Sequence, residues 1–129
     1  MKQQPGIIAL ITVLITGAIV LIIGLGMAER SMLELNTSLD EELSHQALTA
    51  ATSCMERALL SLAGNASYAG NETLSVGTNT CSIATITTSG ITRTVKTSST
   101  VQGYTRRLQV TVSNVNPPLQ VSSWQEVSS

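Results

Sequence analysis

One long apolar run dominates the start of the chain. From Ile7 through Ala28 there is no charged residue, and most positions are Ile, Leu, Val, Ala or Gly. At about 1.5 Å per residue, a helix of about 22 residues spans the roughly 30 Å hydrocarbon core of a bilayer. In lipid, only a helix satisfies every backbone N–H and C=O of a single segment. The pattern therefore predicts a transmembrane helix over residues 7–28.

A cleaved secretory signal is the alternative interpretation of this run. Gly26, Met27 and Ala28 are small or apolar residues of the kind that precede a signal-peptidase site. Against cleavage, the apolar region of a signal peptide is about 7 to 15 residues long, and this run is longer. We therefore expect the helix to be retained. Lys2 precedes the apolar run, and Glu29 and Arg30 follow it. This charge distribution favours an N-terminus in the cytoplasm, with the chain after the run on the other side of the membrane.

The helical pattern continues beyond the apolar run. Small or apolar residues recur in steps of three or four and form one stripe: Met32, Leu35, Leu39, Leu43, Ala47, Ala50 or Ala51, Cys54, Ala58 and Leu62. Most charged residues fall off this stripe, and no Pro or Gly interrupts the sequence between Met27 and Leu62. Gly64 and Asn65 are residues typical of a helix end. Residues 29–64 are thus predicted to be an amphipathic continuation, giving one helix from about Ile7 to Ala63.

After Gly64 the sequence becomes typical of strands and turns. Ser and Thr make up roughly a third of the residues, and short β-branched runs alternate with Gly, Asn and Pro. The candidate strands are Glu72 to Val76, Cys81 to Thr88, Ile91 to Val101, Tyr104 to Val115 and Leu119 to Val127. Apolar and polar residues alternate along the fourth of these, as in a sheet with one face covered. We expect an α+β fold in which the helix stripe covers a small antiparallel β head, residues 65–129.

Two cysteines, Cys54 and Cys81, connect the predicted helix to an early strand. A head of about 65 residues has a small core, and an exported domain lies in an oxidising compartment, so a disulfide is the expected state. A pair of catalytic free thiols is the alternative, but no base lies nearby in the sequence to activate one.

The charge balance and the residue types argue against nucleic-acid binding, catalysis and metal binding. The chain has seven Lys and Arg against eight Asp and Glu, so we expect no basic face of the kind that nucleic-acid-binding proteins use. His45 has no cluster of further ligands, and consecutive residues such as Asp40, Glu41 and Glu42 do not face each other on a helix. We predict no enzyme, no cofactor and no metal site. Trp124 is expected to pack on the head, with a binding hot spot as the alternative.

The N-terminus resembles a type IV pilin or pseudopilin precursor. A short leader, residues 1–6, carries Lys2 and ends in Gly6, and the apolar helix starts at Ile7. The stretch Gly6-Ile-Ile-Ala-Leu-Ile-Thr-Val-Leu14 is similar to the N-termini of minor pilins and minor pseudopilins. The head resembles this family only in its architecture. The resemblance implies that a prepilin peptidase cleaves between Gly6 and Ile7 and methylates the new N-terminus at Ile7.

The family resemblance also implies a function. It predicts a structural subunit of a type IV pilus or of a related secretion or DNA-uptake filament. The expected partners are other pilin subunits, a prepilin peptidase, an inner-membrane assembly platform and membrane lipid. The subunit would start in the bacterial cytoplasmic membrane and end in an extracellular or periplasmic filament. Most pilins have Glu at the fifth mature position, where this chain has Ile11, and that difference favours a minor subunit.

A membrane-anchored β ectodomain that never polymerises is the second hypothesis. It explains the apolar run, the disulfide and the head equally well. It gives no reason for Gly6 directly before the run, nor for a helix that continues unbroken out of the membrane.

Overall fold

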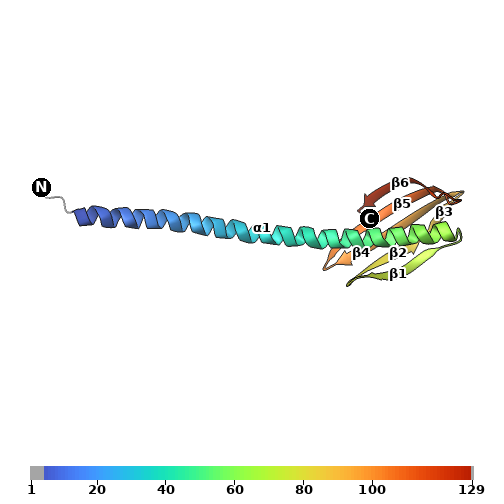
Figure 1. Cartoon of the computed structure of the whole chain (residues 1–129), viewed down its shortest axis with the longest axis horizontal. Helices are drawn as coiled ribbons and strands as arrows, with labels where there is room; N and C mark the ends of the chain where they lie inside the picture. Colours follow the sequence, from blue (N-terminus) through green and yellow to red (C-terminus); the bar gives the residue numbers. More distant parts are fainter. Residues whose placement is uncertain (1–4, 129) are drawn as a thin grey trace. The chain divides into compact units, whose positions relative to one another are not determined.

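The computed structural model describes residues 5–128. It contains one long helix, α1 (Pro5–Gly64), followed by six strands: β1 (Gly70–Val76), β2 (Asn79–Thr85), β3 (Thr87–Ser89), β4 (Thr92–Val101), β5 (Tyr104–Asn114) and β6 (Gln120–Val127). The element order is visible from blue to red in Figure 1. The predicted α+β class is confirmed.

The end of α1 is where the sequence predicts it. The helix ends at Gly64, and the N–H of Asn65 donates to the carbonyl of Ser61 at 2.9 Å, which closes the last turn. A second bond runs from the Tyr68 N–H to the Asn65 carbonyl at 3.0 Å and reverses the chain toward β1. These bonds satisfy backbone groups that a helix terminus otherwise leaves free.

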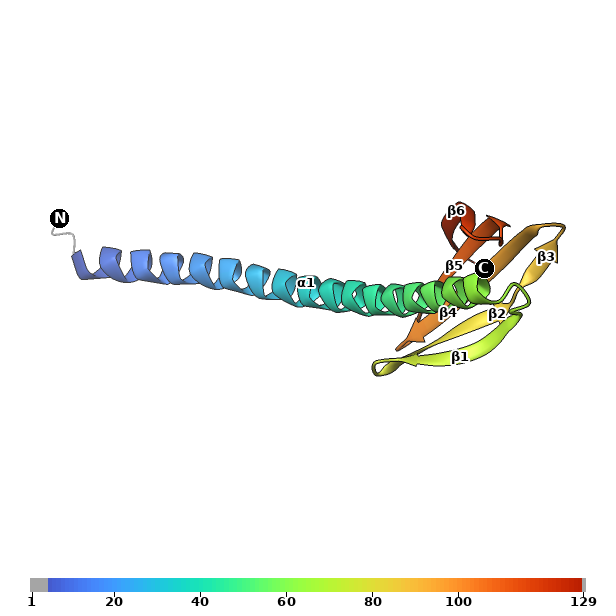
Figure 2. The same cartoon turned by 45° about the vertical axis from the view of Figure 1, so that its right-hand side comes forward.

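The six strands form one antiparallel sheet in the order β1-β2-β4-β5-β6, with β3 paired to β4 beside this path. β1 and β6 are the two edges, as the turned view in Figure 2 shows. The β4–β5 hairpin turns through Gln102 and Gly103, which both have positive φ, as the tightest hairpin turns require. Gly70 is also required, because a Cβ there would lie 2.4 Å from the carbonyl oxygen of Ala84.

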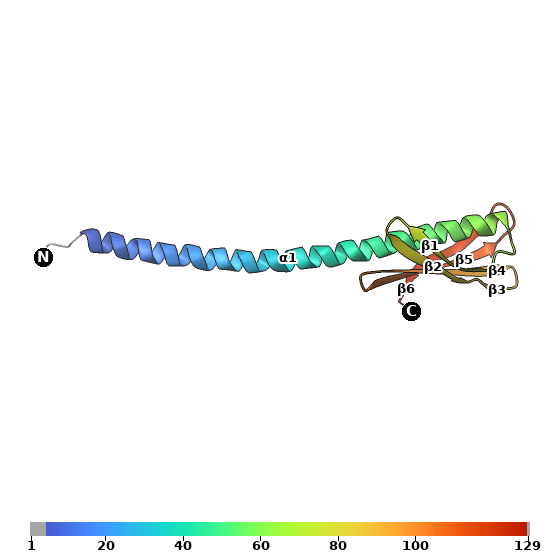
Figure 3. The same cartoon turned by 90° about the horizontal axis from the view of Figure 1, so that it is seen from below.

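The second half of α1 lies along one face of the sheet, while no helix formed by residues 5–128 covers the opposite face (Figures 1 and 3). The helix buries its side with mostly small residues: Ala47, Ala50, Ala51, Cys54, Met55, Ala58 and Leu62. From the sheet, Ile83, Val95, Leu108, Val110 and Val112 complete the core. The Thr97 hydroxyl donates to the Ala51 carbonyl at 2.9 Å, so the strand approaches the helix backbone closely.

The helix stripe is covered over only part of its predicted length. Its members from Ala47 onward are buried and Leu43 is half-buried, whereas Met32, Leu35 and Leu39 are 70%, 60% and 60% exposed. The stripe therefore packs on the sheet through its later members, and its first three members stay exposed. Met55, absent from the predicted stripe, is fully buried because the covered face is wide enough to include the residue beside Cys54.

The predicted strand Cys81 to Thr88 is two strands in the structure. Ile86 interrupts it, with its side chain in the core and its N–H donating to the carbonyl of Ala69 at 2.8 Å. This bond to the chain preceding β1 removes Ile86 from the ladder, so β2 ends at Thr85 and β3 pairs with β4 alone. The other strands lie where expected, within a few residues at their ends.

The chain forms two compact units that divide between Leu39 and Asp40. The first contains the apolar part of α1. The second contains the rest of α1 and the whole sheet, and all contacts between helix and sheet described below lie within it.

Candidate functional site

The expected cleavage position lies at the start of α1. Gly6 and Ile7 are in the first turn and are exposed, while Lys2 and the rest of the leader's first four residues lie outside the described residues. A Cβ at Gly6 would meet no atom within 4 Å. Packing among residues 5–128 therefore gives no reason for a glycine at this position.

The apolar segment of α1 presents its side chains to the outside along its whole length. Every residue from Ile7 to Ala28 is exposed, and the best 18-residue window has a mean hydropathy of 2.9. Among the described residues, α1 is the one helix long and apolar enough to cross a membrane. Thr12 and Thr16 donate their hydroxyl groups to the carbonyls of Ile8 and Thr12, at 2.8 and 2.7 Å, so neither hydroxyl lacks a partner in an apolar setting.

Polar side chains of β5 form hydrogen bonds to the start of the part of α1 that packs on the sheet, residues 40–64, which we call the covered half. The Tyr104 hydroxyl donates to the Asp40 carboxylate at 2.5 Å. One turn further along α1, Arg106 donates to the Ser44 hydroxyl at 2.6 Å and also pairs with Glu126 of β6. The hydrogen bond to Asp40 raises the pKa of the Tyr104 hydroxyl. The two contacts with α1 bring together residues that lie more than 60 positions apart in the sequence.

A disulfide holds the centre of the covered half. Cys54 of α1 and Cys81 of β2 are joined, with their Cα atoms 6.1 Å apart, and both side chains are buried. The pairing expected from the sequence is therefore present. Because both sulfurs are enclosed by the core, their role is structural.

At the other end of the covered half, Tyr68 and Glu72 lie beside the helix terminus. The Tyr68 hydroxyl donates to the Glu72 carboxylate. Partial burial of Tyr68, together with this bond, raises the pKa of its hydroxyl to about 12. Tyr68 therefore stays protonated through the physiological range.

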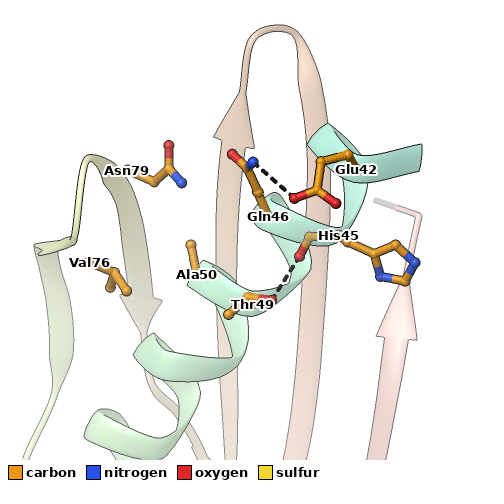
Figure 4. A pocket seen from close by; sticks show the side chains of 7 residues that line it. All are labelled: Glu42, His45, Gln46, Thr49, Ala50, Val76 and Asn79. Atoms are coloured by element: carbon orange, nitrogen blue, oxygen red, sulfur yellow. Dashed lines mark hydrogen bonds between the residues drawn. The ribbon is translucent and has the colours of Figure 1, made fainter. Parts of the chain in front are cut away.

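A shallow pocket of about 200 Å³ lies between α1 and the β1–β2 hairpin, and two of the candidates for chemistry, Glu42 and His45, line it. Figure 4 shows the His45 ring pointing away from Asn79, and Glu42 bonded to Gln46 rather than to His45. Asp40, Glu41 and Glu42 are all exposed. Among residues 5–128, no three His, Cys, Asp or Glu side chains are grouped as a metal ion requires.

Trp124 lies on β6 opposite Val110 and is 47% exposed. Because paired residues of an antiparallel sheet share a face, the ring is on the side of the sheet that carries the helix. Its packing on the head, expected from the sequence, is thus incomplete. All of β6 before Val127 is exposed, since this edge strand extends beyond the cover of the helix.

The chain has the architecture of a pilin: an apolar N-terminal helix whose second half packs on a disulfide-bonded antiparallel sheet. No protein-family model, curated protein or solved structure matches it.

Proposed function

We propose that the chain is a structural subunit, a minor pilin or pseudopilin, of a type IV pilus or a related secretion or DNA-uptake filament. The observation that carries this proposal is that every residue of the first half of α1 is exposed, while the second half of α1 packs on the folded head. A surface of Ile, Leu and Val needs a cover, which lipid provides before assembly and the helices of neighbouring subunits provide afterwards.

The start of the helix supports processing by a prepilin peptidase. Gly6 precedes the apolar run and has no packing role in the chain, which fits a glycine that an enzyme recognises. The products would be a six-residue leader and a subunit that begins with N-methylated Ile7. The membrane helix stays on the subunit, with its N-terminus on the cytoplasmic side.

The role of the subunit is mechanical rather than catalytic. Its partners are other pilin subunits, the peptidase and an inner-membrane assembly platform that extracts it from the bilayer. Gly17, Gly24 and Gly26 leave open space on the helix surface, and a neighbouring helix can approach closely there. Ile11 replaces the acidic residue that pairs with a neighbour's amine in most pilins, which favours a minor subunit.

N-terminal sequencing and intact-mass measurement test this proposal. The full chain is produced in cells with and without a co-expressed prepilin peptidase and is purified from membranes. We expect a subunit that begins at methylated Ile7 only when the peptidase is present. Gly6→Val should block the cleavage, whereas the same change at Gly26 should leave it intact.

Two other products would contradict the proposal. A chain that still begins at Met1 beside an active peptidase would indicate a membrane-anchored ectodomain. A chain that begins at Glu29 would indicate a secreted protein whose apolar run was a signal.

A further inference from the structure

The uncovered face of the sheet differs from the covered face in charge. Strand register assigns each side chain to a face, since neighbours along a strand alternate and paired residues share a side. Lys96 pairs with Gln109, and Arg107 pairs with Ser98. The chain neighbours Thr97 and Leu108 are buried on the helix-bearing face, so both cations lie on the uncovered face.

The carboxylates of the head lie on the other side. Glu72 pairs with buried Ile83, and Glu126 pairs with buried Leu108, so register places both on the helix-bearing face. Each is already engaged there, Glu72 by Tyr68 and Glu126 by Arg106. Strands β1 to β6 contain no other acidic residue. The uncovered face therefore carries two cations that no carboxylate of the strands neutralises.

The two cations share one hollow in that face. Lys96, Ser98, Arg107 and Val127 line a depression of about 180 Å³. Arg107 donates to the carbonyl of Ser128 at 3.0 Å through one terminal nitrogen, and that contact adds no negative charge. Lys96 and Arg107 are both exposed, and within the described residues neither has an ion-pair partner. An anionic group in the hollow would meet both.

Hydroxyl and amide groups surround the hollow. Ser82 and Ser98 are hydrogen-bonded at 2.9 Å across β2 and β4, and Thr100 and Thr105 at 2.7 Å across β4 and β5. Gln109 pairs with Gln125 on the same face, which continues the polar surface to β6. Such groups both donate and accept hydrogen bonds, as the hydroxyls of a sugar do.

We propose that this face binds a polysaccharide that carries carboxylate or sulfate groups, with Lys96 and Arg107 holding an anionic group and the neighbouring hydroxyls and amides contacting the sugars. A nucleic acid fits less well, because two cations neutralise few phosphates and register places Tyr104 and Trp124 on the opposite face, leaving no aromatic platform for bases. A membrane surface also fits less well, since Leu108 is buried and the other aliphatic residues that line the hollow within the described chain are Ala84 and the partly buried Val127.

Affinity for a single copy would be low, because exposed ion pairs contribute little. A dense array of copies raises the overall affinity for a polymer, because once one copy has bound, contacts by the neighbouring copies with the same polymer are effectively intramolecular. The face thus suits binding by many copies at once. The proposal does not depend on the proposed function, because any dense display of the chain would provide such an array.

The test uses the full chain in non-ionic detergent, produced without a peptidase and immobilised at high density. The probes are dextran sulfate, polygalacturonate, neutral dextran and duplex DNA. We expect dextran sulfate or polygalacturonate to bind, neutral dextran not to bind, and DNA to bind more weakly than the better acidic polysaccharide. The double substitution Lys96→Gln and Arg107→Gln should weaken that binding by about tenfold and reduce its salt dependence.

Arg57→Gln with Arg93→Gln is the matched control, since it removes the same charge from positions off the uncovered face. It should change binding by less than about twofold. Equal losses in both variants would reduce the effect to net charge and overturn the proposal. Tighter binding of DNA, or no preference for acidic over neutral dextran, would overturn it as well. Because the chain is unprocessed, these results are independent of whether it becomes a filament subunit.

Discussion

The two halves of α1 use apolar residues in opposite ways. In the first half the large side chains Ile, Leu and Val are all exposed, whereas in the second half the buried positions are mostly alanine. Large aliphatic residues on the first half form an exposed apolar surface that no described part of the chain covers. Small residues let the second half lie close to its sheet. The position of the large residues therefore distinguishes the exposed part of the helix from the part that packs on the sheet.

Removing the disulfide should produce the largest effect, and it should be confined to the second half. The cysteines are 27 residues apart, and cross-linking a loop of that size stabilises a fold by about 3 to 4 kcal/mol in the chain-entropy estimate. We expect the double variant Cys54→Ser, Cys81→Ser to lose about that much in urea unfolding of the full chain in detergent, followed by near-ultraviolet circular dichroism.

Dithiothreitol provides the control for this prediction. It should lower the stability of the native chain toward that of the variant and leave the variant unchanged. A variant as stable as the native chain would mean that helix packing alone holds the head.

The agreement between sequence and structure also differs along the chain. The C-terminal end of α1, most strands and the partners of the disulfide were predictable, because they depend on local signals such as Gly64, the alternation in β5 and the presence of only two cysteines. The break at Ile86 was not, because it depends on a bond to Ala69, and no Gly or Pro marks it.

Contacts between distant residues account for the rest of the difference. The exposure of Met32, Leu35 and Leu39 depends on where the sheet stops covering the helix, and a periodic stripe contains no information about that limit. The bond between Tyr104 and Asp40 and the sorting of charge between the two faces also follow from register. Hydrophobic periodicity alone does not give register, so the uncovered face could not be recognised from the sequence.

A matched pair of alanine substitutions should sharpen the contrast between the two halves. Ala51 is fully buried and its carbonyl accepts the Thr97 hydroxyl, so Ala51→Leu would force helix and sheet apart. Overpacking of this kind costs about 1 to 3 kcal/mol. Ala18 is exposed in the first half, and Ala18→Leu should leave the stability of the head unchanged within about 0.5 kcal/mol.

Urea unfolding of both variants in the same detergent measures the difference. Equal losses would show that the packing of the head depends on the first half of α1. The division between the halves would then be wrong.

The smallest expected effect is a dependence on alkaline pH, which belongs to the second half. Tyr68 has an ordinary pKa of 10.0, and the structure raises it to about 12. A raised pKa means that the folded state favours the protonated hydroxyl, so its contribution to stability is complete below about pH 10 and disappears as the pH rises toward 12. The native chain should lose stability relative to Tyr68→Phe across that interval. Because the chain has two tyrosines, the Tyr104→Phe variant reports on Tyr68 alone through phenolate absorbance. Titration of Tyr68 near pH 10 in the folded protein would show that burial and the bond to Glu72 do not stabilise its protonated hydroxyl.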